Sequence, residues 1–435
     1  MGKPKKILYI SSADPLKGPG AIAMVHYNAL KEAGFDIDFL TQFPVKDHPD
    51  IKYVLDKPGN KYWDYIKRFP YHFLKKFRKP KNDEGPFFYF YRKETEPPLN
   101  IKKVLDKIDT GYDLIIVYFW QRLLSYDTVD KIYDKSGNNP KVYFINADYS
   151  TMTGGCHFFC SCRNFETGCG NCPMINSKNP DDFTAWNVNF RKKIVNKIKP
   201  YVSVNSYTRP FFEKSAVFRN NVTFIPGTIL LDLSKFKNVP SDNIIKKYDI
   251  EAKNKFIILF GSQNFSEERK GMAYLVKALE LLYNRLSPKE RERILLLTIG
   301  DSKEIDSKLP DFHQKHLGYV PVSELPEIYS LANVFVSPSV NDPGPSMVNQ
   351  SIACGTPVVA FEMGTAIDVI KDKESGICVP LKDTAGMAEA IEKIFKMEKN
   401  DYEKMRNTAR KVAEELHSYN GFSKKIEKII NGDFD

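Results

Sequence analysis

The sequence predicts an α/β protein made of two Rossmann-like, doubly wound domains that face a cleft. The chain has 435 residues, enough for two or three domains of ~150 residues each. In both halves short apolar segments alternate with helix-length segments, and a polar stretch at residues 232–240 separates the halves. Alternating strands and helices form parallel sheets, which bind ligands beyond the carboxyl ends of their strands. We therefore expect loops of both domains to line the cleft.

The N-terminal domain, residues 1–232, is predicted to begin as strand, loop, helix and strand. The stretch 6–10 is the first strand, and a Gly-containing loop leads to a helix over 22–33, which Gly34 ends. The second strand covers 36–41. Further strands are expected at residues 114–119, 141–146, 201–205 and 222–225.

The C-terminal domain, residues 233–412, repeats the strand and helix alternation. Its strands are predicted at residues 256–260, 294–299, 334–337 and 357–361, and its clearest helices at 272–285, 323–331 and 384–396. Residues 413–435 are predicted to form a helix that packs back on the N-terminal domain.

The composition excludes a disordered chain and indicates an anionic partner. Hydrophobic residues make up 42% and charged residues 27%, while the net charge is +10. The first apolar run is only four residues long, and no run approaches the ~18 residues that span a bilayer. We therefore expect a cytoplasmic protein with reduced thiols.

Two basic residues lie directly before the first long helix of the C-terminal domain. Arg269 and Lys270 follow the predicted strand 256–260 and its loop, and helix N-termini carry partial positive charge and unpaired N–H groups. Lys270 is therefore a candidate for binding a diphosphate. A solvent-exposed Arg-Lys pair is the alternative interpretation of these two residues alone.

A second segment strengthens this interpretation, because a Gly/Pro loop joins a strand to a short helix at residues 337–361. The loop delivers backbone N–H groups at a helix start, and Gln350 follows on that helix. The candidate donor-binding residues of this segment are Asp342, Gly344, Pro345, Ser346, Met347 and Gln350.

These two segments, with residues 316–330 and 361–368, resemble the donor-binding domain of family 4 glycosyltransferases, which have the GT-B fold. The resemblance covers roughly residues 222–395. It implies a transferase of class EC 2.4 that moves a sugar from a nucleotide-diphosphate sugar with retention of configuration. Lysine and helix N–H groups can stabilise the negative charge of the leaving phosphate, so the expected reaction requires no catalytic metal.

This chain departs from the family pattern at three positions. The family places glutamates eight positions apart, at the donor sugar and at the ribose, where this chain has Asp342 and Gln350. It also often has an arginine where this chain has Ser262. Lys270 is therefore expected to carry the diphosphate contact, with Lys270 and Asp342 catalytic.

Five of the seven cysteines lie between Cys156 and Cys172. Cys156, Cys162, Cys169 and Cys172 can supply four thiolates, the usual set for structural zinc, with Cys160 or His157 as substitutes. Free or redox-active thiols and an iron–sulfur cluster are the alternatives. The segment resembles one in a subgroup of family 4 enzymes for surface polysaccharides.

The end of strand 141–146 carries Asp148, which we predict to be the acceptor-side catalytic carboxylate, with a structural turn as the alternative. Gly18 and Gly20, in the first loop, are predicted to let the backbone approach the donor and acceptor closely.

A basic aromatic insert, residues 61–93, carries eight Lys or Arg between Lys61 and Lys81. Its pattern is typical of a segment lying on anionic lipid. Single-stranded nucleic acid, or packing on its own domain, would use the same residues.

Together these features predict a retaining glycosyltransferase, cytoplasmic and peripheral on the inner face of the membrane. Its expected partners are a nucleotide-diphosphate sugar, a glycan or lipid-linked acceptor of a cell-surface polysaccharide, and an anionic membrane, but not nucleic acid. The alternative hypothesis is a zinc-containing protein of the same fold that binds glycan or nucleic acid without catalysis.

Overall fold

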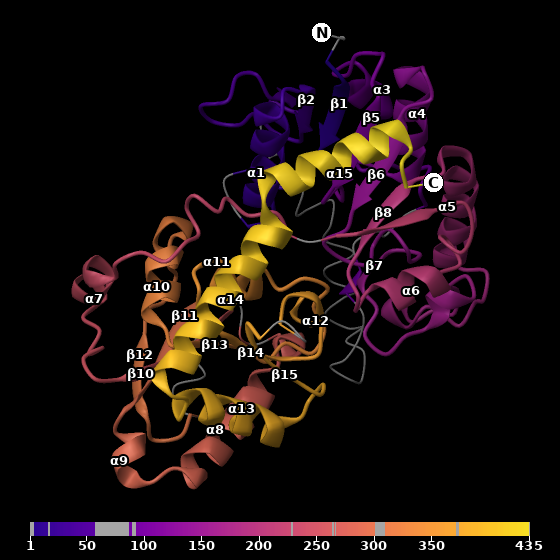
Figure 1. The fold of residues 1–435 in the computed structure, drawn as a ribbon. Coiled ribbons are helices and arrows are strands. Elements are labelled where there is room, and N and C mark those ends of the chain that lie inside the picture. Colours follow the sequence, from indigo (N-terminus) through magenta and orange to yellow (C-terminus); the bar gives the residue numbers. More distant parts are fainter. Residues whose placement is uncertain are drawn as a thin grey trace. The chain divides into compact units, whose positions relative to one another are not determined.

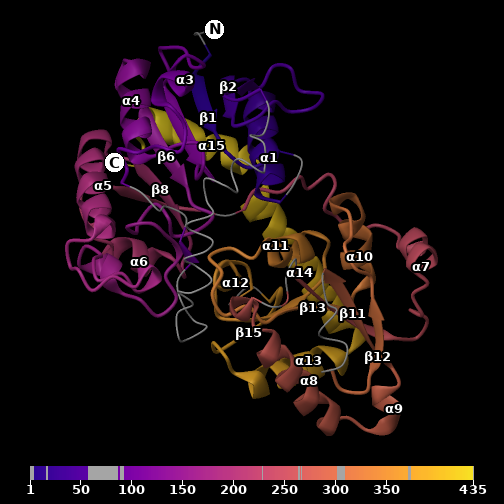
Figure 2. The same ribbon diagram turned by 180° about the vertical axis from the view of Figure 1, so that it is seen from behind.

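The computed structural model describes residues 4–15, 18–56, 87–88, 93–227, 229–262, 265, 267–300, 309–370 and 374–434. The chain divides into two compact units (Figures 1 and 2). The N-terminal unit contains the first part of the chain to Val204, with Thr208–Gly227 and Phe422–Asp435. The C-terminal unit contains Asn205–Tyr207 and Thr228–Gly421. Both units have a parallel sheet, which confirms the predicted α/β fold class.

The N-terminal unit is built on a seven-stranded parallel sheet of order β3-β2-β1-β5-β6-β8-β9. Its strands are β1 (Lys6–Ile10), β2 (Asp36–Thr41), β3 (Lys52–Tyr53), β5 (Leu114–Tyr118), β6 (Lys141–Ile145), β8 (Tyr201–Val204) and β9 (Thr223–Pro226). Because β2 and β3 extend the sheet on one side of β1 while β5 and β6 extend it on the other, the order reverses between β1 and β5. Open α/β sheets bind ligands at such a point.

Helices cover both faces of this sheet (Figures 1 and 2). The helices are α1 (Pro19–Glu32), α3 (Ile101–Leu105), α4 (Tyr126–Ser136), α5 (Phe183–Ile198) and α6 (Arg209–Lys214). Alternate residues of β1 face different cores: Leu8 packs with α4 and α5, and Ile7 packs with α1 and the C-terminal helix. A strand buried on both faces reads as a continuous apolar run, which is why these strands are visible in the sequence.

The N-terminal unit also contains a separate two-stranded antiparallel sheet. It consists of β4 (Phe87–Phe88) and β7 (Cys156–Phe158). The Cys-rich segment after β7 contains two short 3₁₀ helices, Asn164–Glu166 and Pro173–Ile175.

The C-terminal unit has a six-stranded parallel sheet of order β12-β11-β10-β13-β14-β15. Its strands are β10 (Phe256–Ser262), β11 (Ile294–Gly300), β12 (His313–His316), β13 (Val334–Ser337), β14 (Val358–Phe361) and β15 (Gly376–Val379). Its helices are α7 (Asp242–Tyr248), α8 (Met272–Arg285), α9 (Pro288–Arg291), α10 (Leu325–Leu331), α11 (Ser346–Ala353), α12 (Ala366–Val369), α13 (Thr384–Phe395) and α14 (Lys399–His417). Two further 3₁₀ turns cover Glu268–Lys270 and Val322–Glu324.

The last helix, α15 (Tyr419–Asn431), belongs almost wholly to the N-terminal unit (Figure 1). The Phe422 ring stacks on His26 of α1 at 4.9 Å, and Ser423 Oγ donates to the carbonyl of Ala29 at 3.3 Å. Burial beside Lys425 lowers the pKa of His26 to about 3, so this histidine is a neutral core residue.

The structure confirms every strand predicted in both domains and corrects their ends. Phe119 has φ +43° and lies outside β5, because a left-handed residue cannot continue a strand. Three edge strands of the two main sheets, β3, β12 and β15, were not predicted. For example, β12 reads His-Gln-Lys-His and is only partly buried, so it lacks an apolar signal. No helix among the described residues is long and apolar enough to cross a membrane.

Candidate active site

Lys270, Arg269 and Asp342 meet in the C-terminal unit, as the donor-site prediction requires. The Lys270 Nζ lies 2.6 Å from Asp342 Oδ2, and Arg269 Nη1 lies 3.3 Å from the same oxygen. Arg269 also pairs with Glu267 at 2.5 Å. Lys270 keeps 24% of its side chain exposed and Arg269 17%, so both cations remain accessible to a ligand.

Backbone contacts bring the two loops together. Gly271 has φ +72°, and a Cβ there would lie 1.8 Å from the carbonyl oxygen of Pro338, so only glycine fits between the loops. The N–H of Val340 donates to the carbonyl of Arg269 at 2.8 Å. The glycine after Lys270 therefore fixes the basic pair beside the loop that carries Asp342.

The charge of Asp342 depends on its cationic neighbours. Burial alone would raise the pKa of this carboxyl, but the charges of Lys270 and Arg269 and the N–H of Gly344 outweigh burial and lower it. Asp342 is therefore ionised at neutral pH, and its carboxylate holds Lys270 at the site.

The helix α11 starts three residues after Pro343 and begins beside this ion pair. Pro345 is its N-cap residue and provides no side-chain cap, so the first N–H groups of Ser346 and Met347 have no intrahelical carbonyl partner. Gly261 of β10 packs against this helix, since a Cβ there would lie 2.8 Å from Met347 Cε. The predicted residues from Gly344 to Met347 thus form the amide-rich side of the site.

Gln350 lies one turn along α11, where the Tyr329 hydroxyl of α10 donates to its Oε1 at 2.9 Å. Tyr329 is fully buried, and burial raises its pKa well above the usual value, so it acts as a donor. The amide group of Gln350 is thereby oriented with its Nε2 away from Tyr329. Tyr329 was not predicted as a site residue, because it appears in the sequence as one more apolar position of α10.

Ser262 ends β10 and is 8% exposed. Its carbonyl oxygen would lie 1.7 Å from a Cβ on Gly300, so β10 and β11 approach closely at their carboxyl ends. Ser262 therefore belongs to the correct edge of the sheet, while its contact with a donor stays a prediction.

In the N-terminal unit, Asp148 follows β6 and is the centre of a polar network. Its Oδ2 accepts from Gln121 Nε2 at 2.8 Å and lies 2.8 Å from His157 Nδ1, and its Oδ1 accepts from the Ser150 N–H at 2.6 Å. Burial would raise the pKa of Asp148, but His157 and the Ser150 hydrogen bonds lower it. Asp148 is only 3% exposed, so these three groups occupy most of its surface.

A fully buried ion pair fixes the loop that follows Asp148. Arg191 of α5 donates through Nε to Glu94 Oε1 at 2.7 Å and through Nη1 to the carbonyls of Ser150 and Thr153. Glu94 Oε2 accepts from the Tyr126 N–H at 2.7 Å. Sequence reasoning missed this pair because its members lie 97 positions apart.

The four predicted zinc ligands cluster in the structure. The Cys156 and Cys172 thiols are hydrogen bonded, and both interact electrostatically with Cys162, while Cys169 interacts with Cys172. The hydrogen bond from Cys156 and the N–H groups of Met174 and Ile175 lower the pKa of Cys172. Within the described ranges, however, no group of three or more His, Cys, Asp or Glu side chains has the arrangement of a metal site. The zinc assignment stays a prediction.

The two glycines of the first loop have different environments. A Cβ on Gly20 would lie 1.8 Å from the carbonyl oxygen of Asp14, so the chain's own backbone fills the space beside this glycine. Gly18 has φ +48°, and among the described residues no atom lies within 4 Å of the place that a Cβ would take. Contact of either glycine with a ligand stays a prediction.

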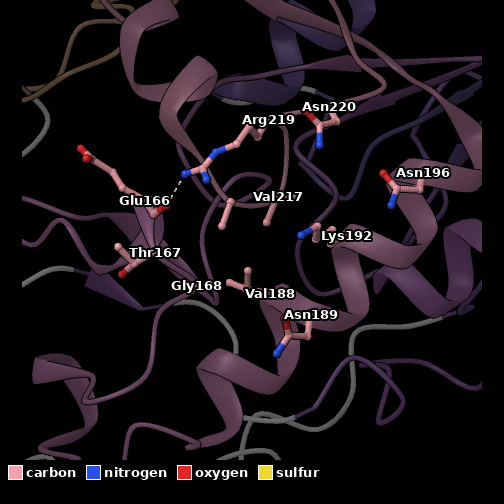
Figure 3. A pocket seen from close by; sticks show the side chains of 11 residues that line it. Glu166, Thr167, Gly168, Val188, Asn189, Lys192, Asn196, Val217, Arg219 and Asn220 are labelled. Carbon is pink, nitrogen blue, oxygen red and sulfur yellow. Dashed lines mark hydrogen bonds between the residues drawn. The ribbon is translucent and has the colours of Figure 1, made fainter.

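A polar hollow of about 340 Å³ lies elsewhere in the N-terminal unit (Figure 3). It is lined by α5, the segment around Glu166 and the segment before β9, and Arg219 donates to the Glu166 carbonyl at 2.8 Å. Its lining includes Lys192 and three asparagines. None of the residues predicted to bind the donor lines this hollow.

Comparison with known proteins gives information on the C-terminal unit that is separate from this geometry. Residues 241–412 match the family described as Glycosyl transferases group 1. The C-terminal unit is similar to group 1 glycosyltransferases. An uncharacterized glycosyltransferase of Methanocaldococcus jannaschii is 25% identical over 195 residues, 43% of this chain and 47% of the relative. A phosphatidyl-myo-inositol mannosyltransferase of Mycolicibacterium smegmatis is 29% identical over 164 residues, 37% of this chain and 40% of the relative.

The chain thus spans less than half of the length of these two curated relatives. Solved structures match nearly all of it. Sucrose-phosphate synthase of Thermosynechococcus elongatus has a TM-score of 0.62 and 18% identity over 99% of both chains. Anabaena HepE in complex with UDP and glucose has a TM-score of 0.58 and 14% identity, covering 98% of this chain and 100% of HepE. At these identities the likeness shows the fold, which is GT-B.

Proposed function

We propose that this protein is a retaining glycosyltransferase that moves a sugar from a nucleotide-diphosphate sugar to a glycan acceptor. In this proposal the acceptor is lipid-linked, and the product is part of a cell-surface polysaccharide. One observation carries the proposal: Lys270, Arg269 and Asp342 meet beside the start of α11. The match of residues 241–412 to group 1 glycosyltransferases supports it, as does the fold shared with HepE, which was crystallised with UDP and glucose.

In the proposed reaction the bond between the anomeric carbon and the diphosphate oxygen breaks, and its electron pair stays on the diphosphate. Lys270, Arg269 and the first N–H groups of α11 stabilise this negative charge, which requires no metal ion. The acceptor oxygen forms the new bond on the same face of the sugar, and its proton passes to the leaving phosphate. In this proposal Asp342 binds a hydroxyl of the donor sugar, and Gln350 binds the ribose of the nucleotide. Both contacts hold the donor in place before the transfer.

The test is nucleotide release from a panel of UDP-, GDP-, ADP- and dTDP-sugars. Lys270→Ala is expected to lower the rate about 10²–10³-fold, the usual cost of removing one group that stabilises transition-state charge. Lys277→Ala is the matched control, because Lys277 lies on the exposed side of α8 and pairs only weakly with Glu280 at 3.7 Å. If Lys270→Ala matches the wild type, this reaction is not the function.

The alternative, a binding protein without catalysis, predicts a different result. In that case the wild-type protein would bind a glycan or a nucleic acid in calorimetry but would release no nucleotide from any of these sugars. This alternative rests on Asp342 and Gln350, which stand where the family has glutamates.

The membrane role depends on the basic aromatic insert, nearly all of which lies outside the described residues. Eight basic residues between Lys61 and Lys81 would be attracted to an anionic membrane. Each basic residue near the lipid surface contributes ~1 kcal/mol to the free energy of binding. Changing Lys75, Lys76, Arg78 and Lys79 to Glu should abolish sedimentation with phosphatidylglycerol vesicles. Unchanged sedimentation would remove the peripheral-membrane assignment.

The zinc proposal rests on the clustering of Cys156, Cys162, Cys169 and Cys172. Zinc would hold the loop after Asp148 by ligating these thiolates. Elemental analysis of the purified protein should find one zinc per chain, and Cys169→Ser should lower this value. A protein free of metal as purified would overturn the proposal.

A further inference from the structure

The polar hollow of the N-terminal unit has three walls that come from separate parts of the chain (Figure 3). The helix α5 forms one wall, residues 166–168 of the Cys-rich segment form the second, and the segment from Ala216 to Asn220, before β9, forms the third. The volume of about 340 Å³ lies at the small end of the ~300–1,000 Å³ that ligand pockets occupy. The hollow is therefore large enough for one small ligand.

Hydrogen bonds tie the second wall to the third. The N–H of Ala216 donates to the carbonyl of Phe165 at 3.0 Å, and Arg219 donates through Nη2 to the carbonyl of Glu166 at 2.8 Å. These contacts use protein groups alone, so the shape of the hollow does not depend on a ligand. Sites for small molecules are usually formed in advance in this way.

The wall of α5 is a row of polar side chains. Asn189, Lys192 and Asn196 are spaced three and four positions apart, so they lie on one side of the helix. The Oδ1 of Asn196 accepts from Asn221 Nδ2 at 3.2 Å, which joins this wall to the chain after Asn220. The amide NH₂ of Asn196 remains as a donor. Asparagine amides both donate and accept hydrogen bonds, as neighbouring hydroxyl groups on a sugar ring do.

Two cations line the hollow without a carboxylate partner among the described residues. Lys192 has no ion pair in this part of the chain, and Arg219 contacts the backbone carbonyl of Glu166 rather than its side chain. Figure 3 shows the carboxylate of Glu166 directed away from both cations. A hollow lined by one sign of charge concentrates ligands of the opposite sign. The hollow therefore favours an anionic ligand.

The hollow also has an apolar part. Val188 and Val217 line it and are each 1% exposed, and Figure 3 shows Val217 between Arg219 and Lys192. The C–H groups of a sugar ring can pack on such a surface while the hydroxyl groups at its rim reach the amides. The described lining contains no aromatic side chain on which a nucleobase could stack. These features suit a sugar better than a nucleotide.

We propose that this hollow binds a hexose unit that carries an anionic group, a carboxylate or a phosphate. Lys192 and Arg219 bind the anionic group, the asparagine amides bind hydroxyl groups, and the ring packs on Val217. The site goes beyond the proposed function and does not depend on it, because none of the residues predicted to bind the donor lines the hollow. A protein without transferase activity could therefore still have this site.

The test measures the binding of small compounds to the full-length protein by saturation-transfer NMR, which detects weak binding. Methyl glucuronide and glucose 6-phosphate are the anionic sugars, and methyl glucoside is the neutral sugar. Acetate and methyl phosphate carry the same anionic groups without the ring. The variants are Lys192→Gln and Arg219→Gln. The matched control is Lys193→Gln, because Lys193 is the next residue of α5, is exposed and does not line the hollow.

The wild type should bind at least one anionic sugar more tightly than the neutral sugar and more tightly than the anion without a ring. Lys192→Gln and Arg219→Gln should each weaken this binding about tenfold or more, the usual effect of losing a hydrogen bond to a charged group. Lys193→Gln should leave the binding unchanged, and an excess of UDP should not displace the sugar.

Several results would overturn the site. They are the absence of binding by both anionic sugars, equal binding of the neutral sugar, equal binding by Lys192→Gln and Lys193→Gln, and displacement by UDP, which would assign the sugar to the donor site. Acetate or methyl phosphate that binds as tightly as the sugars would show an anion site only. Nucleotide release is measured separately, so a failure of the proposed function leaves this test intact.

Discussion

The two units contain charged networks that differ in burial. In the N-terminal unit the side chains of Arg191 and Glu94 have 0% exposure. In the C-terminal unit Lys270 and Arg269 keep about a fifth of their side chains exposed around Asp342. Both networks pair basic side chains with a carboxylate, but only the network of the C-terminal unit leaves its cations partly exposed.

The difference follows from the cost of burying charge. A buried charge that loses its partner is left without solvent or a counter-charge, which costs much free energy. Arg191 and Glu94 can therefore hold a loop, but they cannot separate to bind a ligand. A partly exposed cation is partly hydrated and can exchange one anion for another at low cost. We therefore expect Lys270 to be able to exchange Asp342 for a phosphate, while Arg191 holds the loop after Asp148 in place. Substitutions in each network can break or sharpen this contrast.

The largest expected effect is on stability in the N-terminal unit. Arg191→Met keeps most of the side-chain volume but leaves Glu94 as a buried charge without its cation, so it should lower the free energy of unfolding by about 3–5 kcal/mol. Urea unfolding measures this. The control is Arg285→Met, whose exposed pairs with Glu389 and Glu392 should contribute little. Equal costs for the two variants would refute the contrast.

A smaller stability effect, with a large effect on activity, is expected in the C-terminal unit. Asp342→Asn removes the anion between Lys270 and Arg269, whose exposed ends remain hydrated, so the free energy of unfolding should change by only about 1 kcal/mol. Nucleotide release should fall about 10²-fold, because the cations lose the anion that positions them. A large loss of stability with intact turnover would show that Asp342 is structural.

The smallest effect is a pH dependence. The folded pKa of Asp342 lies below its unfolded value of 3.8, so its stabilising contribution is complete above pH 3.8 and is lost as the pH falls through the folded pKa. Lys270→Met removes the main opposing charge, and burial then raises this pKa. The variant should therefore lose stability at a higher pH than the wild type in acid titrations followed by circular dichroism. Coincident acid transitions would contradict this account.

Much of the fold could be predicted from the sequence because its strands are buried on both faces. β1, β5, β10 and β11 read as continuous apolar runs. β12 and β15 could not be predicted, since edge strands bury less and carry weaker patterns. The positive φ of Phe119 could not be predicted either, because phenylalanine rarely adopts the left-handed conformation and its residue type gives no sign of it.

The candidate site divides in the same way. Lys270, Asp342 and Gln350 could be predicted because local motifs carry them. Tyr329 and Glu94 could not, since their partners lie 21 and 97 positions away and hydrogen bonds between distant residues leave no local pattern. Asp148 was predicted, but not the neighbours that hold it.

By itself the sequence determined the α/β class, the repeated strand and helix order and the basic pair before α8, because these depend on periodicity and short-range spacing. Only the tertiary structure decided that Asp342 closes on Lys270, that His157 faces Asp148, and that Arg191 and Glu94 are buried together. The physical reason is that burial and charge pairing are properties of segments brought together by folding, and the free energy of a charge depends on the groups around it.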